Sequence, residues 1–528
     1  MKCFKHGAIK RGAIAALLAT VALPALAADL MIGRAAEPSS IDPQFSRTGN
    51  NQGTAQLMFG RLIEQDANLQ ISPGLATEWN AVDDTTWEIK LREGVKFHDG
   101  SALTADDVIY SLERTDEVPN SPAPFSDMVS SIDTMEKVDD LTIRIKTKEP
   151  APAFIEDIGR VFIISKAASE GKSSEDFNTG TATVGTGPYK FVSFKPGESL
   201  TIEAFDGYWG AQPEFKDVEV RFISNDAARV AALLSGSVDL IDAVPPADVA
   251  RLEEQEGINV VSAASGRVIY LGLSQRFDQA PGVFDLDGKP LAENPFRDPR
   301  VRKAISLMID RQLVVDRILG GAGVPAGQLV PAVLGGYAED LKPDEVDVAK
   351  AKELLTEAGY PDGFALKLYS SNNRFPGDGD LVQALGQMLT RGGLKVQGVE
   401  ALPYNVYSKA ASAGDYGAFV FSLGSSTPTS APNLSSLIQT YDKEAGTGAF
   451  NRVRFSSKAF DDALAVALQE FDAQKRDELL AEATRIAFAE TPIVPLYWQK
   501  VFWGARKGIT IDGGLSEYTL AQDVKRVD

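Results

Sequence analysis

Two hydrophobic periodicities alternate along this chain, and each predicts a different secondary structure. Apolar residues at every second position are typical of a strand with one buried face, and they recur over 87–91, 141–145, 218–222 and 364–368. Apolar residues at every third or fourth position are typical of a helix with one buried face, and they recur over 104–112, 301–308, 348–358, 381–388 and 460–486. Strands that alternate with helices predict an α/β protein built around sheets.

The chain is long for a single compact domain. It has 528 residues, of which 44% are apolar and 24% are charged, and these fractions are typical of a soluble globular protein. A single sheet would be very large for a chain of this length. The sequence therefore predicts two or three lobes.

The first 27 residues have the three parts of a secretory signal peptide. Residues 1–11 carry four basic side chains and no acidic one, residues 13–23 are almost entirely apolar, and Ala25-Leu26-Ala27 is a small-x-small cleavage site. A membrane anchor is the alternative, but the apolar run has only about half of the ~20 residues that a spanning helix needs. We expect a signal peptide at 1–27 and a soluble product exported to the periplasm.

Removal of this segment would change the chemistry that the protein can perform. The segment holds Cys3, the only cysteine, and His6, so the mature chain keeps one histidine, His98, and no thiol. Disulfides, thiolate nucleophiles and cysteine-based metal sites are thereby excluded. The four basic residues also leave, and the formal charge of −20 becomes −24. This acidic excess disfavours nucleic acids and anionic membranes as partners.

No motif in the sequence predicts an enzyme. His98 stands beside Asp99 in a turn, but no Gly-x-Ser-x-Gly segment accompanies it, and acidic pairs on so acidic a chain are usually solvated. We expect no catalytic residue, no metal site and no cofactor. A periplasmic hydrolase stays open as an alternative, and it would require an activated serine, or two carboxylates about 5–10 Å apart, facing a cleft.

A series of motifs resembles one family of transport proteins. Residues 90–100 (KLREGVKFHDG) and 103–108 (LTADDV) resemble the signature of family 5 solute-binding proteins, the dipeptide- and oligopeptide-type binding proteins of ABC importers. Further segments resemble the family, in its order, over nearly the whole mature chain: 185–189, 205–210, 298–305, 349–361 and 491–495.

The resemblance implies a two-lobe periplasmic binding protein of the venus-flytrap type, in the large class that has an extra subdomain. The implied segments are 28–50, 184–268 and 493–528 for lobe I, 51–183 for the extra subdomain of lobe I, and 269–492 for lobe II. The chain would cross between the lobes near 266–272 and 491–495, and these crossings would act as hinges.

The implied function is capture of a small peptide or peptide-like solute between the lobes, followed by delivery to an inner-membrane ABC permease. A ligand that contacts both lobes favours the closed state. The resemblance implies a monomer, and ATP would be hydrolysed by a separate protein. An opine or a small saccharide stays open as the cargo, whereas a metal cargo is disfavoured because His98 is the sole imidazole.

Arg374 is the leading candidate for contact with the cargo. It follows the predicted strand 364–368 and precedes the predicted helix 381–388. In dipeptide-type relatives the similar segment supplies an arginine for the ligand carboxylate. A guanidinium holds a carboxylate with two parallel hydrogen bonds, which a lysine cannot do.

The loop 421–430 departs from the pattern of the peptide-binding relatives. Those relatives often place an aspartate there, which pairs with the amino terminus of the peptide, but this chain has no acidic residue between Phe421 and Tyr441. The loop instead resembles a version with Ser425, Ser426 and Thr427, whose hydroxyls suit a neutral or hydroxyl-rich ligand. Asp378 or Asp380 is the alternative source of the missing charge.

Three further residues are candidates for the cleft. Ser39 and Ser40 lie in the segment 37–42, which is similar to the first cleft-bordering loop of lobe I in relatives. Tyr404 is a candidate aromatic contact, with core packing as the alternative.

Overall fold

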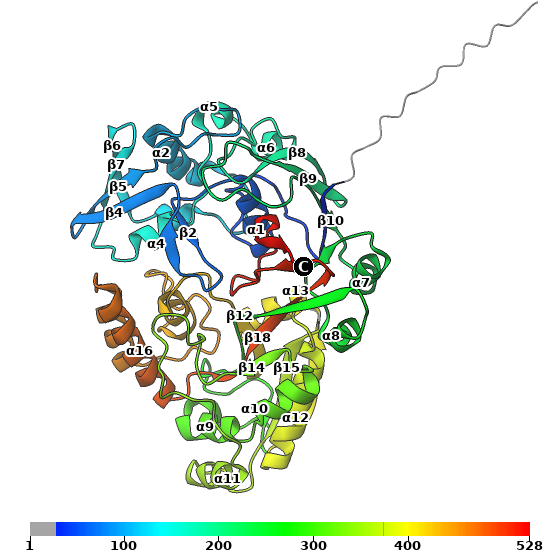
Figure 1. Cartoon of the computed structure of the whole chain (residues 1–528). Helices are drawn as coiled ribbons and strands as arrows, with labels where there is room; N and C mark the ends of the chain where they lie inside the picture. The colour runs from blue at the N-terminus through cyan, green and yellow to red at the C-terminus, as the bar shows by residue number, and fades with distance from the viewer. Residues whose placement is uncertain (1–27, 373, 528) are drawn as a thin grey trace, which may run out of the picture.

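The computed structural model describes residues 28–372 and 374–527. The signal peptide predicted at 1–27 lies outside the described residues. Within the described part of the chain, no helix is both long and apolar enough to cross a membrane. The chain forms two lobes of strands and helices, which lie one above the other in Figure 1.

One mixed sheet of twelve strands runs through both lobes. In spatial order its strands are β13 (Val283–Phe284), β15 (Ala365–Ser371), β17 (Ala418–Leu423), β12 (Ile258–Leu273), β18 (Val494–Arg506), β11 (Leu240–Ile241), β1 (Leu30–Arg34), β10 (Asp217–Phe222), β9 (Ser199–Ala204) and β8 (Tyr189–Lys195). Strand β16 (Lys395–Leu402) pairs with β15, and β14 (Gly323–Pro325) pairs with β18.

Strands β12 and β18 connect the two lobes because each is long enough to belong to both. They pair antiparallel over most of their length. In lobe I, β18 also pairs with β11; in lobe II, β12 pairs with β17 and β18 pairs with β14. The register shifts between Ala264 and Val268, and an irregularity of this kind bends and twists a strand locally. The lobes therefore share one hydrogen-bonded ladder that contains an irregular point.

The segment predicted to be the extra subdomain carries its own antiparallel sheet in the order β4-β5-β7-β6. These strands are β4 (Ala76–Asp83), β5 (Thr86–Leu91), β7 (Thr142–Thr147) and β6 (Ile132–Asp139), and a hairpin of β2 (Ile63–Gln65) and β3 (Ile71–Pro73) lies beside them in sequence. The helix predicted at 104–112 is α2 (Ala105–Arg114). The Thr104 N–H donates to Asp107 Oδ2 at 3.0 Å, as the capping pattern predicts.

The remaining helices divide between the two lobes. Those before β12 are α1 (Gly49–Met58), α3 (Ser126–Val129), α4 (Phe154–Ile158), α5 (Lys166–Ser169), α6 (Ser174–Asn178), α7 (Asp226–Ser235) and α8 (Pro246–Glu253). Those after it are α9 (Pro299–Leu307), α10 (Arg311–Leu313), α11 (Val348–Glu357), α12 (Asp378–Gly392), α13 (Tyr404–Ala413), α14 (Ala431–Asn433), α15 (Lys458–Leu468) and α16 (Ala473–Ala489). Near the C-terminus, β19 (Ile509–Ile511) pairs with β20 (Val524–Arg526).

Most predicted elements are confirmed, and one helix is corrected. The four predicted strands are β5, β7, β10 and β15, and the helices predicted over 301–308, 348–358 and 381–388 are α9, α11 and α12. The segment 460–486 is two helices rather than one. The Asp472 side chain accepts a hydrogen bond from the Lys475 N–H at 2.8 Å and so begins a second helix there.

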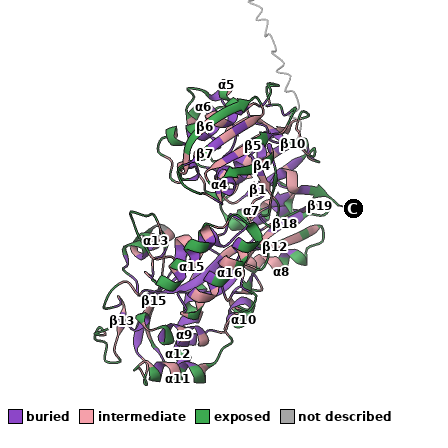
Figure 2. Ribbon diagram, turned by 90° about the vertical axis from the view of Figure 1, so that its left-hand side faces the viewer, coloured by how far each residue is buried: buried purple, intermediate pink, exposed green. Residues whose placement is uncertain are grey.

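The core of lobe II has two parts, one on each face of its sheet. Successive residues of β12 alternate between them, because side chains of a strand point to opposite faces. Ile269 and Leu271 pack into one part, and Val268 and Tyr270 pack into the other. A third core joins lobe I to the subdomain. Figure 2 shows buried residues along the strands of both lobes. The exact lobe boundaries given above stay predictions.

Candidate ligand-binding cleft

A cavity of about 490 Å³ lies where the two lobes meet. Lobe I contributes Arg34 and Asn50, the connecting strand β12 contributes Arg267, and lobe II contributes Arg374 and Ser425. Two smaller cavities share lining residues with it, so together they extend the cleft. A space of several hundred cubic ångströms is typical of a small-molecule site.

The topology of the sheet explains the lobe I side of the cavity. Strand β1 pairs in parallel with β10 on one side and with β11 on the other. Arg34 is the last residue of β1, and Asp242 directly follows β11. The carboxyl ends of neighbouring parallel strands meet at one edge of a sheet, which is where open α/β sheets bind ligands. The fold therefore delivers both charged side chains to the cavity.

Burial perturbs these two charges. Desolvation lowers the pKa of Arg34, which the nearby Asp242 partly offsets. Desolvation also raises the pKa of Asp242, against the opposing effects of Arg34 and of a hydrogen bond from the Ala35 N–H at 2.7 Å. Both residues line the cavity, so a ligand can alter this balance.

The connecting strand carries an ion pair that also lines the cavity. Arg267 Nε lies 3.2 Å from Glu517 Oε1, and the Ser265 hydroxyl donates to the same oxygen. Glu517 has a φ of +66°, a left-handed conformation that is uncommon outside glycine. The two side chains keep 21% and 25% of their surface exposed, so both can contact a ligand.

Arg374 lies where the sequence placed it, at the edge of the cavity. Its guanidinium carbon is 5.2 Å from the ring centre of Tyr404, so the two predicted residues form a cation–π contact with each other. The Arg374 N–H donates to Asp378 Oδ2 at 3.0 Å, and Ser371 Oγ donates to the same oxygen at 2.7 Å. Asp378 is buried and holds its own loop together. Asp380 is exposed on α12 and does not line the three cavities of the cleft.

Two of the three hydroxyl residues predicted from the loop 421–430 line the cavity. Ser425 Oγ accepts a hydrogen bond from Asn433 at 2.9 Å. Ser426 Oγ accepts one from Arg160 Nη1 at 3.3 Å, so this residue bridges the lobes. Thr427 is buried behind them and donates to the Thr429 carbonyl at 3.1 Å.

Ser39 and Ser40, which were predicted to contact the ligand, do not line the three cavities of the cleft. The Ser39 hydroxyl donates to Asn51 Oδ1 at 3.1 Å, which ties the loop to α1. Ser40 is buried, and its hydroxyl donates to Asn178 Oδ1 at 3.0 Å. The structure thus gives both serines hydrogen bonds within the protein.

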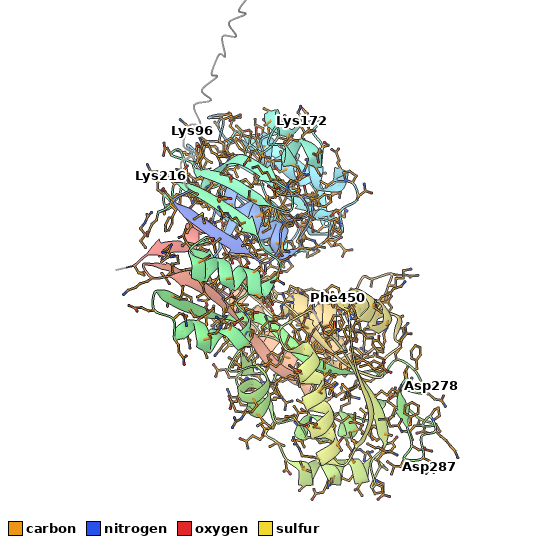
Figure 3. The ribbon with its side chains drawn as sticks, turned by 90° about the vertical axis from the view of Figure 1, so that its right-hand side faces the viewer. Lys96, Lys172, Lys216, Asp278, Asp287 and Phe450 are labelled. Carbon is orange, nitrogen blue, oxygen red and sulfur yellow. The ribbon has the colours of Figure 1, made fainter. Side chains whose placement is uncertain are left out.

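Phe450 is an exposed apolar residue that lines the cleft. It lines the main cavity and a neighbouring one of about 250 Å³, together with Arg47. Its side chain is large, apolar and 45% exposed. Figure 3 labels it at the edge of lobe II that faces lobe I. This part of the cleft offers an apolar contact beside a guanidinium.

The lobes also touch at a second place, away from the connecting strands. Arg476 Nη2 of α16 lies 2.8 Å from Glu156 Oε1 of α4, and the two side chains are 10% and 9% exposed. Nearby, the rings of Trp87 and Phe471 stack with their centres 6.4 Å apart. We call these four residues the outer contact. Burial raises the pKa of Glu156, and Arg476 opposes that rise.

His98 serves the fold rather than the cleft. Its Nε2 lies 3.0 Å from the Gly187 carbonyl oxygen, and the Gly185 N–H donates to its Nδ1 at 3.3 Å. The ring also packs edge-on against Phe205. Within the described part of the chain, no group of three or more His, Cys, Asp or Glu side chains is arranged to hold a metal ion.

Several residues of the cavity had no signal in the sequence. Arg34, Asp242, Arg267 and Glu517 belong to no motif, and they come together only through the order of strands in the sheet. Asp242 and Glu517 both bring a carboxylate to the cavity, whereas the loop 421–430 has no acidic residue.

Comparisons with known proteins agree with this architecture. The model of the bacterial extracellular solute-binding proteins, family 5 (middle), matches residues 70–445. The chain is 28% identical over 512 residues to the glutathione-binding protein GsiB of Escherichia coli O157:H7, which covers 96% of this chain and 95% of that protein. It is 29% identical over 496 residues to GsiB of Salmonella typhi, covering 93% of each.

Solved structures share the fold over nearly the whole chain. The periplasmic binding protein DppA from Helicobacter pylori, in complex with peptide STSA, superposes with a TM-score of 0.74 at 24% identity, covering 94% of this chain and 98% of that one. AgaA from A. tumefacien R10, in complex with agropinic acid, gives a TM-score of 0.72 at 26% identity, covering 94% and 99%. These likenesses confirm the predicted two-lobe fold.

Proposed function

Because the chain belongs to the bacterial extracellular solute-binding proteins of family 5, as its motifs predicted, we propose that its cleft captures a peptide or peptide-like solute. Like the members of its family and its relatives, the protein is a substrate-binding component of an ABC importer and not an enzyme. The periplasmic hydrolase is therefore set aside.

One observation supports the class of ligand. The same cavity presents a guanidinium with no ion pair in the described chain, that of Arg374, and an accessible carboxylate, that of Glu517. A peptide carries an ammonium at one end and a carboxylate at the other. A charged group placed in a cleft needs an opposite partner, and this cavity provides one of each sign.

Glu517 also weakens the argument for a cargo without an amine. The sequence kept opines and saccharides open as the second choice because the loop 421–430 has no acidic residue. The C-terminal segment instead supplies a carboxylate to the cavity, that of Glu517, and Asp242 lines the same cavity. The curated relatives are glutathione-binding proteins, and glutathione is a tripeptide with a free amine.

The shared ladder supports a binding mechanism based on closure. Arg374 belongs to lobe II, and Glu517 belongs to the C-terminal segment that packs on lobe I, where the Leu515 N–H donates to the Ala67 carbonyl at 2.7 Å. A ligand that contacts both favours the state in which the lobes are close. Bending at the irregular point between Ala264 and Val268 is the motion that would bring them together.

Location and partners complete the proposal. The segment 1–27 would direct export and be removed, the mature chain would work as a monomer in the periplasm, and the closed form would deliver its cargo to an inner-membrane permease. We keep the predicted segments 28–50 and 184–268 for lobe I and 269–492 for lobe II, but we move the start of the last lobe I segment beyond 493, because Val494, Leu496 and Tyr497 pack in the core of lobe II.

A thermal-shift screen of residues 28–528 tests the proposal. The probes are glutathione, di- to pentapeptides, agropinic acid and small saccharides. A ligand at 100 times its Kd stabilises the folded state by about 2.7 kcal/mol, which gives a readable shift in Tm. We expect shifts with free-amine peptides or glutathione, followed by saturable binding in calorimetry. Shifts with saccharides alone would contradict the proposed ligand class.

A further inference from the structure

Arg34 is a buried charge that the protein leaves incompletely paired. Its side chain is 5% exposed and lines the main cavity. Nη1 donates to Thr54 Oγ1 at 3.0 Å, whereas Nε has no hydrogen-bond partner. The nearest carboxylate oxygen in its ion pair, Asp242 Oδ2, is 4.0 Å from Nε, which is beyond hydrogen-bonding distance. Nε is itself covered by protein, so a ligand in the cavity can add contacts only at the Nη atoms, and such contacts would offset part of the cost of burying the guanidinium.

Helix α1 presents its N-terminus to the same place. Gly49, Asn50 and Gln52 of its first turn line the cavity beside Arg34. No acidic residue lies in this first turn, and the N-cap residue Thr48 makes no side-chain capping bond. The free N–H groups and the dipole of a helix N-terminus favour an anion.

The other charges around the cavity do not satisfy Arg34. Asp242 accepts the Ala35 N–H at 2.7 Å and also lies 3.9 Å from Arg229. Glu517 is held by Arg267. The cavity thus keeps two guanidiniums without a close carboxylate, Arg34 on lobe I and Arg374 on lobe II.

We propose that Arg34 and the first turn of α1 form a lobe I subsite for a carboxylate of the ligand. The preferred cargo is then a peptide-like compound with two carboxylates and one amine, in which Arg374 holds one carboxylate, Arg34 the other, and Glu517 the ammonium. This inference rests on the proposed function and narrows its ligand class. The protein as a whole is acidic, whereas arginines outnumber carboxylates in the lining of this cavity, which suits an anionic cargo.

The test combines a ligand series with one variant. The probes are glutathione, its monoethyl ester and its diethyl ester, which carry two, one and no free carboxylates, and Kd is measured by calorimetry. We expect two successive losses of affinity in the wild-type protein, each about tenfold or more, because each ester removes a charged partner. A single loss, or none, would overturn the two-carboxylate cargo, and this arm does not depend on the folding of any variant.

In Arg34→Gln, glutathione should bind about tenfold or more weakly, and one of the two losses along the series should disappear. A merely structural defect would weaken all three probes alike and keep both losses, which would overturn the assignment. Arg61→Gln is the matched control, because Arg61 is also a buried lobe I arginine with an unpartnered Nε but does not line the cleft. It should leave the series unchanged.

The outcomes separate this inference from the proposed function. If the wild-type protein binds a peptide of the screen that has a single carboxylate more tightly than glutathione, the two-carboxylate cargo is wrong and the proposed function stands. If glutathione or such a peptide binds but Arg34→Gln leaves its Kd unchanged, the subsite is wrong and the proposed function stands. If no peptide binds at all, the proposed function fails.

Discussion

His98 makes the stability of this protein depend on pH in a way that can be calculated. Burial is the main cause that lowers the pKa of His98 from 6.5 to about 4. The hydrogen bond to the Gly187 carbonyl opposes this shift and raises the pKa. The other hydrogen bond favours the neutral ring: Nδ1 accepts from the Gly185 N–H, so a proton on Nδ1 would face another donor. Nearby Lys190 lowers the pKa further, while Asp99 opposes it.

The sign follows from proton binding in the two states. Between pH 4 and 6.5 the unfolded chain binds a proton at His98 and the folded chain does not, so folding is favoured as pH rises. The contribution of the neutral His98 ring to the free energy of unfolding is complete above pH 6.5 and is lost as the pH falls toward 4. From pH 7.5 to pH 5.0, linkage gives a loss of about 2 kcal/mol in the free energy of unfolding.

The perturbation is His98→Gln, which keeps a donor for the Gly187 carbonyl but does not titrate. Urea unfolding of both proteins at several pH values isolates the histidine, since all other groups are common to both. We expect the wild-type protein to lose about 2 kcal/mol more than the variant between pH 7.5 and 5.0. Equal pH dependence in the two proteins, or an NMR titration of His98 near pH 6.5, would refute the reasoning.

Three further predictions concern the cleft and the outer contact. Arg374→Ala should weaken peptide binding by about 2 kcal/mol without changing Tm, because the side chain is exposed; calorimetry with an unchanged Kd would contradict this. Glu517→Gln should weaken free-amine peptides more than their N-acetylated forms, and an equal effect on both would remove Glu517 as the ammonium partner. Arg476→Met leaves Glu156 buried and unpaired. This should destabilise the arrangement in which the lobes meet at the outer contact by about 3 kcal/mol, relative to one in which they are further apart. X-ray scattering should then show a larger radius of gyration, whereas Lys90→Met, at an exposed ion pair, should not.

The sequence predicted the parts of the cleft that depend on local chain geometry. Arg374 comes shortly after the end of β15, and Ser425 and Ser426 come shortly after the end of β17, so a strand pattern and a loop resemblance were sufficient to place them. The same reasoning found the start of α2 at Thr104. The break between α15 and α16 was missed because the apolar spacing continues across the turn that Asp472 begins.

The rest of the cleft depends on contacts between distant parts of the chain. Arg34 and Asp242 are 208 residues apart, and they meet only because β1 and β11 are neighbours in the sheet. Glu517 reaches Arg267 because β18 returns the chain to lobe I. Strand order follows from the whole packed structure, and no short motif encodes it.

The ladder that spans both lobes also determines when each lobe can be completed. In lobe I, β1 pairs with β11, whose other edge is covered by β18; in lobe II, β18 covers β12 and β14. Since β18 begins at Val494, close to the C-terminus, neither half of the sheet gains its β18 partner until nearly the whole polypeptide has been synthesised. Pairing over such long sequence separations is slow. For the export proposed above, a chain that completes its sheet so late would stay longer in the unfolded form that a narrow membrane pore can admit.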